Sequence, residues 1–172
     1  LGLTQTHTQI VFSTTRIKMK SPKKPTPTQN QKRSEWDEIW MDFASNIARR
    51  SPDPNFKVGC CIVSHDNCQV LAIGYNGDHK GGSNVRESLE PGGSGFIHAE
   101  INALIKLDYN NPKKKTLYIT LSPCKQCAKA IINSGIGKVI YDNEYRDTSG
   151  LNLLREAGVD VKRYVLNAKD RD

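Results

Sequence analysis

Residues 116–135 read TLYITLSPCKQCAKAIINSG, and this stretch predicts a strand followed directly by a helix. The apolar, β-branched run Thr116–Leu121 is typical of a buried strand. A helix is predicted over Cys124–Ser134, because Pro123 suits a helix start and Gly135 stands where a helix C-cap belongs. Strand-to-helix units of this kind are the building blocks of α/β folds.

The same alternation of strand and helix extends outward from this unit in both directions. The other predicted elements, in chain order, are a helix from Ser34 that ends before Ser51, strands Val58–Val63 and Gln69–Ile73, a helix from about His98 to Lys106, strand Lys138–Tyr141, helix Ser149–Ala157 and strand Val159–Tyr164. A glycine-rich stretch, Gly74–Gly95, is long enough to be a functional loop. This order predicts a three-layer α/β/α sandwich around a five-stranded, mostly parallel central sheet.

The first predicted helix carries its own start signal. Ser34 is a candidate N-cap, and Asp37 follows three residues later, as in a capping box. Apolar residues then recur at helical spacing, at Trp36, Ile39, Trp40, Phe43 and Ile47.

The positive charge of the chain is confined to its N-terminal segment. The chain has 25 Lys and Arg and 18 Asp and Glu, but seven of the basic residues and none of the acidic ones lie within residues 1–33. From Ser34 onward, 18 basic residues therefore face 18 acidic ones. A neutral body argues against nucleic acid as a partner. Residues 1–33 are predicted to be a disordered basic extension, and residues 34–172 a single domain.

The cysteine content and the hydropathy predict a cytoplasmic protein. Five cysteines are too few for a disulfide scaffold, which favours a reducing, intracellular setting. Cys60, Cys61 and Cys68 are predicted to be structural. No apolar run approaches a membrane span, so no membrane partner is expected. The acid-free N-terminal segment also resembles an organellar transit peptide, with a start at Met19 as the alternative explanation.

The motifs HAE at residues 98–100 and PCKQC at residues 123–127 contain the residue types that hold and use zinc. His98, Cys124 and Cys127 supply three ligands for Zn²⁺ and leave a fourth tetrahedral position open, as in catalytic zinc sites. Both motifs are predicted at helix N-termini, where the helix dipole stabilises thiolates. The pattern H-x-E…P-C-x-x-C is the signature of zinc deaminases that act on nucleobases.

Glu100 is the candidate catalytic residue, because one carboxylate can act first as a base and then as an acid. We expect zinc-bound hydroxide as the nucleophile and Glu100 as the proton shuttle to the ring nitrogen and the departing amine. His98 and Glu100 can reach one site only if His98 lies at the helix entrance. The alternative is a structural zinc site, for which the candidate fourth ligands are His65, His79, Cys60, Cys61 and Cys68.

From about Ser51 to Tyr164 the chain resembles the cytidine and deoxycytidylate deaminase superfamily, and within it the deoxycytidylate (dCMP) deaminases. The motifs that carry the resemblance are SPDPNFKVGCCIV, AIGYNG, FIHAEINALIK, LYITLSPCKQCAKAIINSGIGKVIYDNEY and LLREAGV. The resemblance implies a cytidine deaminase-like fold, a zinc cofactor and hydrolysis of dCMP to dUMP and ammonia. It also implies a homo-oligomer, either a dimer or a hexamer.

The resemblance further implies substrate contacts at Asn76, Ala99 and Tyr145. Asn76 of GYNG corresponds to the family asparagine that hydrogen-bonds the sugar and the pyrimidine edge, and Ala99 lies within HAE. Tyr145 falls where family members place an aromatic ring beside the base. From the residues alone, Asn76 and Gly77 also form an ordinary turn pair, and Tyr145 is equally suited to simple packing.

The loop after GYNG departs from the family pattern, because it is short and contains no cysteine. This departure leaves regulation by nucleoside triphosphates without support. Other substrates, namely free cytidine, guanine or tRNA adenosine, remain alternatives, as does a non-catalytic zinc-binding module. The loop's candidates for holding a phosphate, which are otherwise solvent-facing residues, are Lys80, Arg86, Gly92, Gly93 and Gly95.

Overall fold

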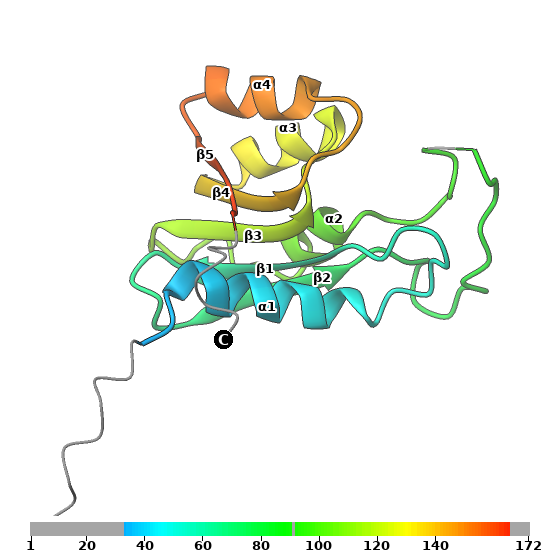
Figure 1. Cartoon of the computed structure of the whole chain (residues 1–172), viewed down its shortest axis with the longest axis horizontal. Helices are drawn as coiled ribbons and strands as arrows, with labels where there is room; N and C mark the ends of the chain where they lie inside the picture. The colour runs from blue at the N-terminus through cyan, green and yellow to red at the C-terminus, as the bar shows by residue number, and fades with distance from the viewer. Residues whose placement is uncertain (1–32, 91, 166–172) are drawn as a thin grey trace, which may run out of the picture. The chain divides into compact units, whose positions relative to one another are not determined.

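The computed structural model describes residues 33–90 and 92–165, so the predicted extension lies outside the described residues except for Arg33. The elements are α1 (Trp36–Ala48), β1 (Gly59–Ser64), β2 (Val70–Tyr75), α2 (Ala99–Leu104), β3 (Lys115–Leu121), α3 (Lys125–Asn133), β4 (Ile136–Asn143), α4 (Ser149–Glu156) and β5 (Asp160–Arg163) (Figure 1). Their order agrees with the prediction. Among these helices, none combines the length and the apolar character needed to cross a membrane.

The strands form one sheet in the order β2-β1-β3-β4-β5. β1 pairs antiparallel with both β2 and β3, whereas β3 with β4 and β4 with β5 are parallel. The sheet is therefore mixed, which corrects the prediction of a mostly parallel sheet. The reason is that β1 and β2 form a hairpin, and β1 then takes an interior position where both of its neighbours run against it. The other four strands share one direction, so their C-terminal ends meet at one edge.

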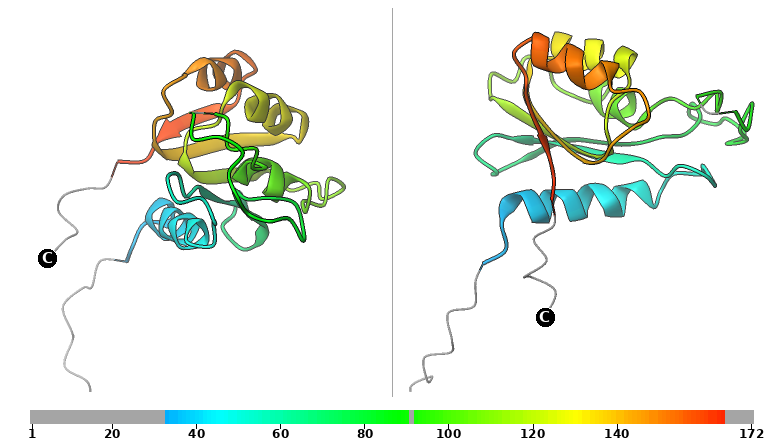
Figure 2. Two further views of the ribbon diagram at one scale, coloured as in Figure 1. Left: turned by 90° about the vertical axis from the view of Figure 1, so that its right-hand side faces the viewer. Right: turned by 45° about the horizontal axis from the view of Figure 1, so that its top comes forward.

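Helices cover both faces of the sheet, which confirms the three-layer architecture (Figures 1 and 2). α1 packs on one face, whereas α2, α3 and α4 pack on the other. β1 is buried along its whole length, and its side chains alternate between the layers. Cys61 and Val63 join the α1 core, whereas Cys60 and Ile62 join the core under α2, α3 and α4. Cys60 and Cys61 are thus buried core residues, as expected for structural cysteines, whereas Cys68 is exposed.

The start of α1 differs from the prediction. Its N-cap is Glu35, no side chain caps it, and the prediction of Ser34 as N-cap is wrong. The carboxylate of Asp37 has another use, because it accepts hydrogen bonds from the Tyr118 hydroxyl of β3 and from Lys162 Nζ of β5, each at 2.8 Å. These bonds tie α1 to the sheet, so tertiary partners replace the expected local cap.

Two glycines allow helices to approach the backbone closely near the sheet edge. A Cβ atom on Gly74 of β2 would collide with the carbonyl oxygen of Ala99 in α2. A Cβ atom on Gly150 of α4 would collide with the carbonyl oxygen of Pro123 and with the backbone of Cys124. The two glycines therefore set the positions at which α2 and α3 begin.

Candidate metal centre and active site

The candidate metal ligands lie at the edge where the C-terminal ends of β2 and β3 meet the starts of α2 and α3. His98 is the N-cap of α2, Cys124 is the N-cap of α3, and Cys127 lies in the first turn of α3. The prediction that His98 lies at a helix entrance is confirmed. Ligands of α/β folds commonly bind at this edge, outside the carboxyl ends of the strands.

The spacing of the three ligand atoms fits zinc. His98 Nδ1 lies 3.6 Å from Cys124 Sγ and 3.3 Å from Cys127 Sγ. Tetrahedral zinc, with bonds of about 2.3 Å to sulfur and about 2.05 Å to nitrogen, holds such atoms about 3.6 Å apart. One imidazole and two thiols are also a donor set that zinc prefers. Sequence prediction and geometry thus select the same three residues.

The candidates for a fourth protein ligand lie elsewhere. Across the described residues, the metal-ligating cluster contains only His98 and the two cysteines. The thiol of Cys60 lies 3.3 Å from the carbonyl oxygen of Ala99, and that of Cys61 contacts the α1 layer. The exposed candidates outside the cluster are His65, His79 and Cys68. A three-ligand set of this kind is the pattern of catalytic zinc.

The electrostatics of the cluster favour a bound cation. Hydrogen bonds from Cys127 and His98 lower the pKa of Cys124 to about 3. The hydrogen bond with Cys124 raises the pKa of Cys127 in the metal-free cluster. A coordinated dication deprotonates thiols outright, and the start of α3 adds the positive end of a helix dipole.

Glu100 lies in the first turn of α2, and only 4% of its surface is exposed. Burial raises the pKa of its carboxyl group to about 7, while the nearby His98 opposes this shift. A carboxyl group with a pKa close to neutral pH can both accept and return a proton. Glu100 is therefore a candidate proton carrier beside the ligand cluster.

A cavity of about 500 Å³ opens at this cluster, a volume typical of small-molecule sites. All three predicted substrate contacts contribute to its wall, together with His98 and Glu100. The residues of the wall are Asp53, Phe56, Val58, Asn76, Arg86, Gly92, Ser94, His98, Ala99, Glu100, Leu121, Ser122, Cys124, Glu144, Tyr145 and Arg146.

Asn76 supports the cavity wall through bonds to the protein. Its Oδ1 accepts a hydrogen bond from the Val58 amide at 2.8 Å. Its Nδ2 donates to the carbonyl oxygen of Phe56 at 2.8 Å and to Asp53 at 3.4 Å. The side chain thus holds the segment before β1, which is more than the turn role inferred from the residues alone. Its contact with a substrate stays a prediction.

Tyr145 lies on the loop between β4 and α4. Its amide donates to Ser122 Oγ at 2.8 Å, and Ser122 is two residues before Cys124. The guanidinium carbon of Arg146 lies 5.5 Å from the centre of the Tyr145 ring, which is a cation–π contact. The backbone of Tyr145 is therefore anchored to the metal-ligand segment, and a guanidinium lies near its ring.

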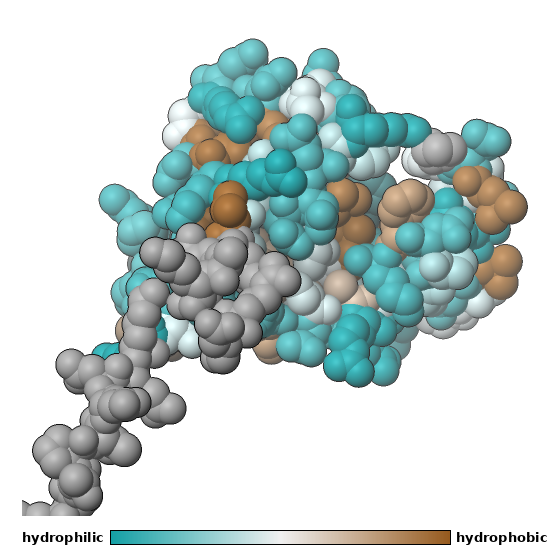
Figure 3. All heavy atoms as spheres, viewed as in Figure 1, coloured by the Kyte–Doolittle hydropathy of each residue, from teal (hydrophilic) through white to brown (hydrophobic). Residues whose placement is uncertain are grey.

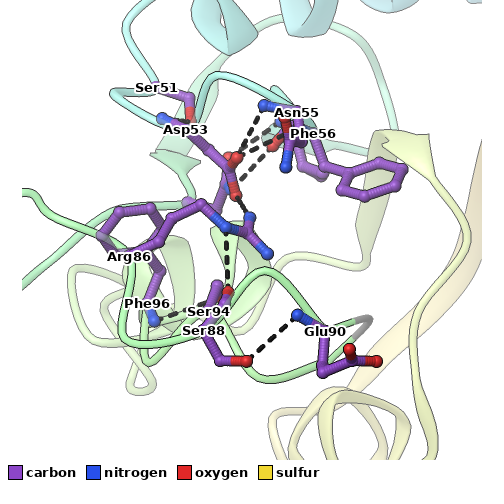
Figure 4. Close-up of polar contacts among 11 residues, drawn as sticks. Ser51, Asp53, Asn55, Phe56, Arg86, Ser88, Glu90, Ser94 and Phe96 are labelled. Atoms are coloured by element: carbon purple, nitrogen blue, oxygen red, sulfur yellow. Dashed lines mark hydrogen bonds and ion pairs between the residues drawn. The ribbon is translucent and has the colours of Figure 1, made fainter.

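A buried ion pair joins the glycine-rich loop to the segment before β1 (Figure 4). Arg86 Nη1 lies 2.5 Å from Asp53 Oδ2, and these side chains are 7% and 2% exposed. The other Asp53 oxygen accepts hydrogen bonds from the amides of Asn55 and Phe56, and Arg86 Nε donates to the carbonyl oxygen of Ser88. Sequence reasoning missed this pair, because Asp53 lies between two prolines and signalled only a helix end.

The structure separates the candidate phosphate-binding groups of the glycine-rich loop. Arg86 lines the cavity but is paired with Asp53, and Gly92 also lines the cavity. Lys80 is exposed and, like Gly93 and Gly95, is not part of the cavity wall. Arg146, which the sequence did not single out, contributes the second guanidinium of the wall.

The chain is similar to known deaminases along most of its length. Residues 34–143 match the family described as cytidine and deoxycytidylate deaminase zinc-binding region. Deoxycytidylate deaminase of Homo sapiens is 35% identical over 144 residues, which are 76% of this chain and 80% of that protein. The probable deoxycytidylate deaminase of Drosophila melanogaster is 35% identical over 162 residues, covering 82% and 79% of the two chains.

A solved structure agrees with these relatives. The crystal structure of dCMP deaminase from the cyanophage S-TIM5 in complex with dCMP and dUMP matches with a TM-score of 0.66 at 36% identity, covering 74% of this chain and 95% of that one. The family match includes both motifs that meet at the ligand cluster. The chain therefore belongs to the cytidine and deoxycytidylate deaminase family that carries this zinc-binding region.

Proposed function

We propose that this protein is a zinc-dependent hydrolase that converts dCMP to dUMP and ammonia. The observation that carries the proposal is the meeting of His98, Cys124 and Cys127 beside the buried carboxyl group of Glu100, at a cavity that His98, Glu100 and Cys124 line. The substrate is supported by the human and fly relatives and by the cyanophage enzyme, whose structure contains dCMP and dUMP.

Each residue of the cluster has a distinct task in this reaction. His98 and the two cysteines would hold zinc, which would supply the Lewis acidity that makes water a nucleophile at neutral pH. Glu100 accepts the two protons of the attacking water in turn and delivers one to the ring nitrogen and the other to the departing amino group. The water oxygen stays on C4 of the pyrimidine, and the amino group leaves as ammonia, so the reaction needs no further reactant.

Three further residues of the cavity wall are assigned to positioning the pyrimidine base. We assign to Ala99 a main-chain contact, because the first residues of a helix have amides without intrahelical partners. Tyr145 presents an aromatic ring that suits stacking or edge contact with a pyrimidine. Asn76 positions the segment before β1 through its side-chain bonds and is part of the cavity wall.

A substrate panel tests this proposal. The zinc-loaded protein is incubated separately with dCMP, CMP, deoxycytidine, dCTP, guanine and tRNA, and ammonia release is followed for each. We expect dCMP to give the highest kcat/KM. A higher value for another compound would overturn the assigned substrate, and no ammonia from any of them would favour the non-catalytic zinc-binding module.

We also propose that the protein forms a homo-oligomer, as the resemblance to the family implies. Val85 and Leu89 are 68% and 80% exposed on the loop that follows β2, where Figure 3 shows apolar side chains at the surface. Light scattering on the intact chain checks this point, with a monomer at working concentration as the contrary result. Replacing both residues with Ser should weaken any association that uses this loop.

We also propose that the domain begins at residue 34, after the basic extension, and that the protein is cytoplasmic. The balanced charge from Ser34 onward and the small number of cysteines support them. Fluorescence microscopy of the full chain carrying a C-terminal fluorescent tag would test the location. Accumulation in an organelle would favour the transit-peptide interpretation of the N-terminal segment.

A further inference from the structure

The wall of the cavity includes parts of two segments, the one before β1 and the glycine-rich loop. The two segments contribute three wall residues each, namely Asp53, Phe56, Val58, Arg86, Gly92 and Ser94. At the base of the loop, the backbones of Gly77 and Ile97 pair with each other. This pairing fixes the two ends of the loop, and a separate contact has to place its middle.

Arg86 is the residue that anchors the middle of the loop. Its side chain is only 7% exposed, although its neighbours Val85 and Glu87 are both exposed. Val85 and Leu89 are 68% and 80% exposed, so these apolar side chains do not hold the loop against the domain. A polar contact does so instead, because Arg86 Nη1 lies 2.5 Å from Asp53 Oδ2.

Asp53 uses both of its oxygens to organise the other segment. Its Oδ1 accepts hydrogen bonds from the amides of Asn55 at 2.9 Å and Phe56 at 3.2 Å, as Figure 4 shows. Its Oδ2 accepts hydrogen bonds from Arg86 and, at 3.4 Å, from Asn76 Nδ2. Four donors thus fill the acceptor positions of one buried carboxylate. The loop, the segment before β1 and the residue after β2 all meet at Asp53.

Phe56 is held through its backbone on both sides. Its amide donates to Asp53, and its carbonyl oxygen accepts a hydrogen bond from Asn76 Nδ2 at 2.8 Å. The residue lines the cavity and is 57% exposed, so burial in the core does not fix its position. The position of Phe56 depends on these backbone hydrogen bonds, and through them on Asp53 and on the arginine that balances its charge.

Stability alone does not account for the ion pair. Transfer of two charges out of water opposes their attraction, so a buried ion pair adds little net stability. The pair does supply geometry, because hydrogen bonds between charged groups are short and directional. A wall that is ordered before the substrate arrives also lowers the cost of ordering side chains on binding.

We propose that Asp53 and Arg86 form a positioning pair that holds Asn76 and Phe56 in place to receive the nucleoside part of the substrate. This inference rests on the proposed function and deepens it, since it names the residues that prepare the site for its substrate. The pair acts through Asn76 and Phe56 and takes no part in the chemical step.

Steady-state kinetics of the zinc-loaded protein test the pair. In Arg86→Gln and in Asp53→Asn, KM for dCMP should rise roughly 5- to 50-fold, because one or two side chains must then be ordered on binding. The value of kcat should stay within about threefold, since a rise in KM alone is the sign of lost binding. Arg86→Lys keeps the charge and a donor but not the planar fork, so its KM should lie between those of the wild type and Arg86→Gln.

The double variant Asp53→Asn/Arg86→Gln tests whether the two residues act through one contact. Its KM should be close to that of either single variant, because the second substitution removes a contact that is already lost. A rise equal to the product of the two single effects would overturn the pair. The double variant also leaves no unpaired buried charge, so it provides the test if a single variant fails to fold.

A second ion pair provides the control for stability. Lys162 Nζ lies 2.8 Å from Asp37 Oδ2, and neither residue is part of the cavity wall. Lys162→Gln should lower the free energy of unfolding and leave KM unchanged. If Arg86→Gln behaves in the same way, with lower stability and an unchanged KM, the pair is merely structural and the inference is overturned.

A nucleoside separates positioning from a direct contact with the phosphate. The rise in KM caused by Arg86→Gln should be the same factor for deoxycytidine as for dCMP, because the pair holds residues that receive the nucleoside part. A rise for dCMP alone would mean that Arg86 itself binds the phosphate, and it would overturn the inference.

Hydrogen exchange gives a readout that needs neither turnover nor ligand. In Arg86→Gln, the amides of Asn55 and Phe56 should exchange faster, while those of β3 should be unchanged. Unchanged exchange at both amides would overturn the inference. A wild type that releases no ammonia from dCMP, but whose dissociation constant for dUMP rises in Arg86→Gln, would contradict the proposed function alone. A wild type that deaminates dCMP, with KM unchanged in Arg86→Gln, would contradict the inference alone.

Discussion

Each face of the central sheet holds a carboxyl group, and the two groups have opposite electrostatic fates. On the α1 face, burial raises the pKa of Asp37, but hydrogen bonds from Lys162 and Tyr118 outweigh it, so the net pKa is lowered. On the α2 face, burial raises the pKa of Glu100 to about 7. A carboxylate that accepts several hydrogen bonds, such as Asp37, stabilises the fold. A carboxyl group whose pKa is raised by burial, such as Glu100, destabilises the fold when it is ionised and is a candidate for a catalytic role.

The largest difference between the faces should come from their cysteines. Cys127→Ser removes a ligand on the α2 face, so bound zinc should fall from about one ion per chain to a small fraction, and ammonia release from dCMP should vanish. Cys61→Ala changes a buried thiol on the α1 face and should retain both. Elemental analysis of the purified variants measures zinc. One zinc ion per chain in an active Cys127→Ser protein would contradict the assignment of Cys127 as a zinc ligand.

The two carboxyl groups should separate activity from stability. Glu100→Gln should lower kcat about 10²- to 10⁴-fold while zinc content is unchanged, because the proton carrier is lost and the ligands are intact. Asp37→Asn should leave kcat within about twofold and lower the free energy of unfolding by about 1–2 kcal/mol, since it weakens two hydrogen bonds. Steady-state kinetics and urea unfolding measure the pair. Full activity in Glu100→Gln would refute its assigned role.

The glycine contacts under the ligand segment should have a moderate effect. Gly150→Ala places a methyl group against the backbone of Pro123 and Cys124, so we expect a loss of about 1–3 kcal/mol in unfolding free energy and weaker zinc binding. Gly137→Ala in β4 is the matched control, because a Cβ atom there meets nothing within 4 Å. Thermal unfolding with and without zinc compares the two variants. Equal behaviour would show that this close approach does not position Cys124.

The smallest effect should be a pH dependence of opposite sign on the two faces. In chelator-treated protein, Glu100 binds its proton more tightly when folded than at its ordinary pKa of 4.5, so stability relative to Glu100→Gln should fall as pH rises from 4.5 to about 7. The pKa of Asp37 is lowered from its ordinary value of 3.8. The stabilisation from Asp37 should therefore be complete above pH 3.8 and should disappear as the pH falls below the pKa of Asp37 in the folded protein. Urea unfolding at several pH values measures how the contribution of each residue to the free energy of unfolding changes with pH. Changes of the same sign for Glu100 and Asp37 would contradict this prediction.

Much of the site could be predicted because its determinants are local. Pro123 and Gly135 bracket α3, Gly135 has the positive φ of 72° expected after a helix, and His98 had to begin α2 for Glu100 to share its site. When residues are close in sequence and lie at the start of a helix, the helix itself sets the positions of their side chains relative to one another. The interior, reversed position of β1 was missed, because strand pairing depends on partners far along the chain.

The order of the elements, the three candidate metal ligands and the candidate proton carrier follow from the amino-acid sequence alone, because short spacings and residue chemistry specify them. The tertiary fold brings Arg86 to Asp53, 33 residues away, and Asp37 to Lys162, 125 residues away. It also decided that Glu100 is buried. Ion pairing and desolvation act through space, so they arise only once the chain has brought distant segments together.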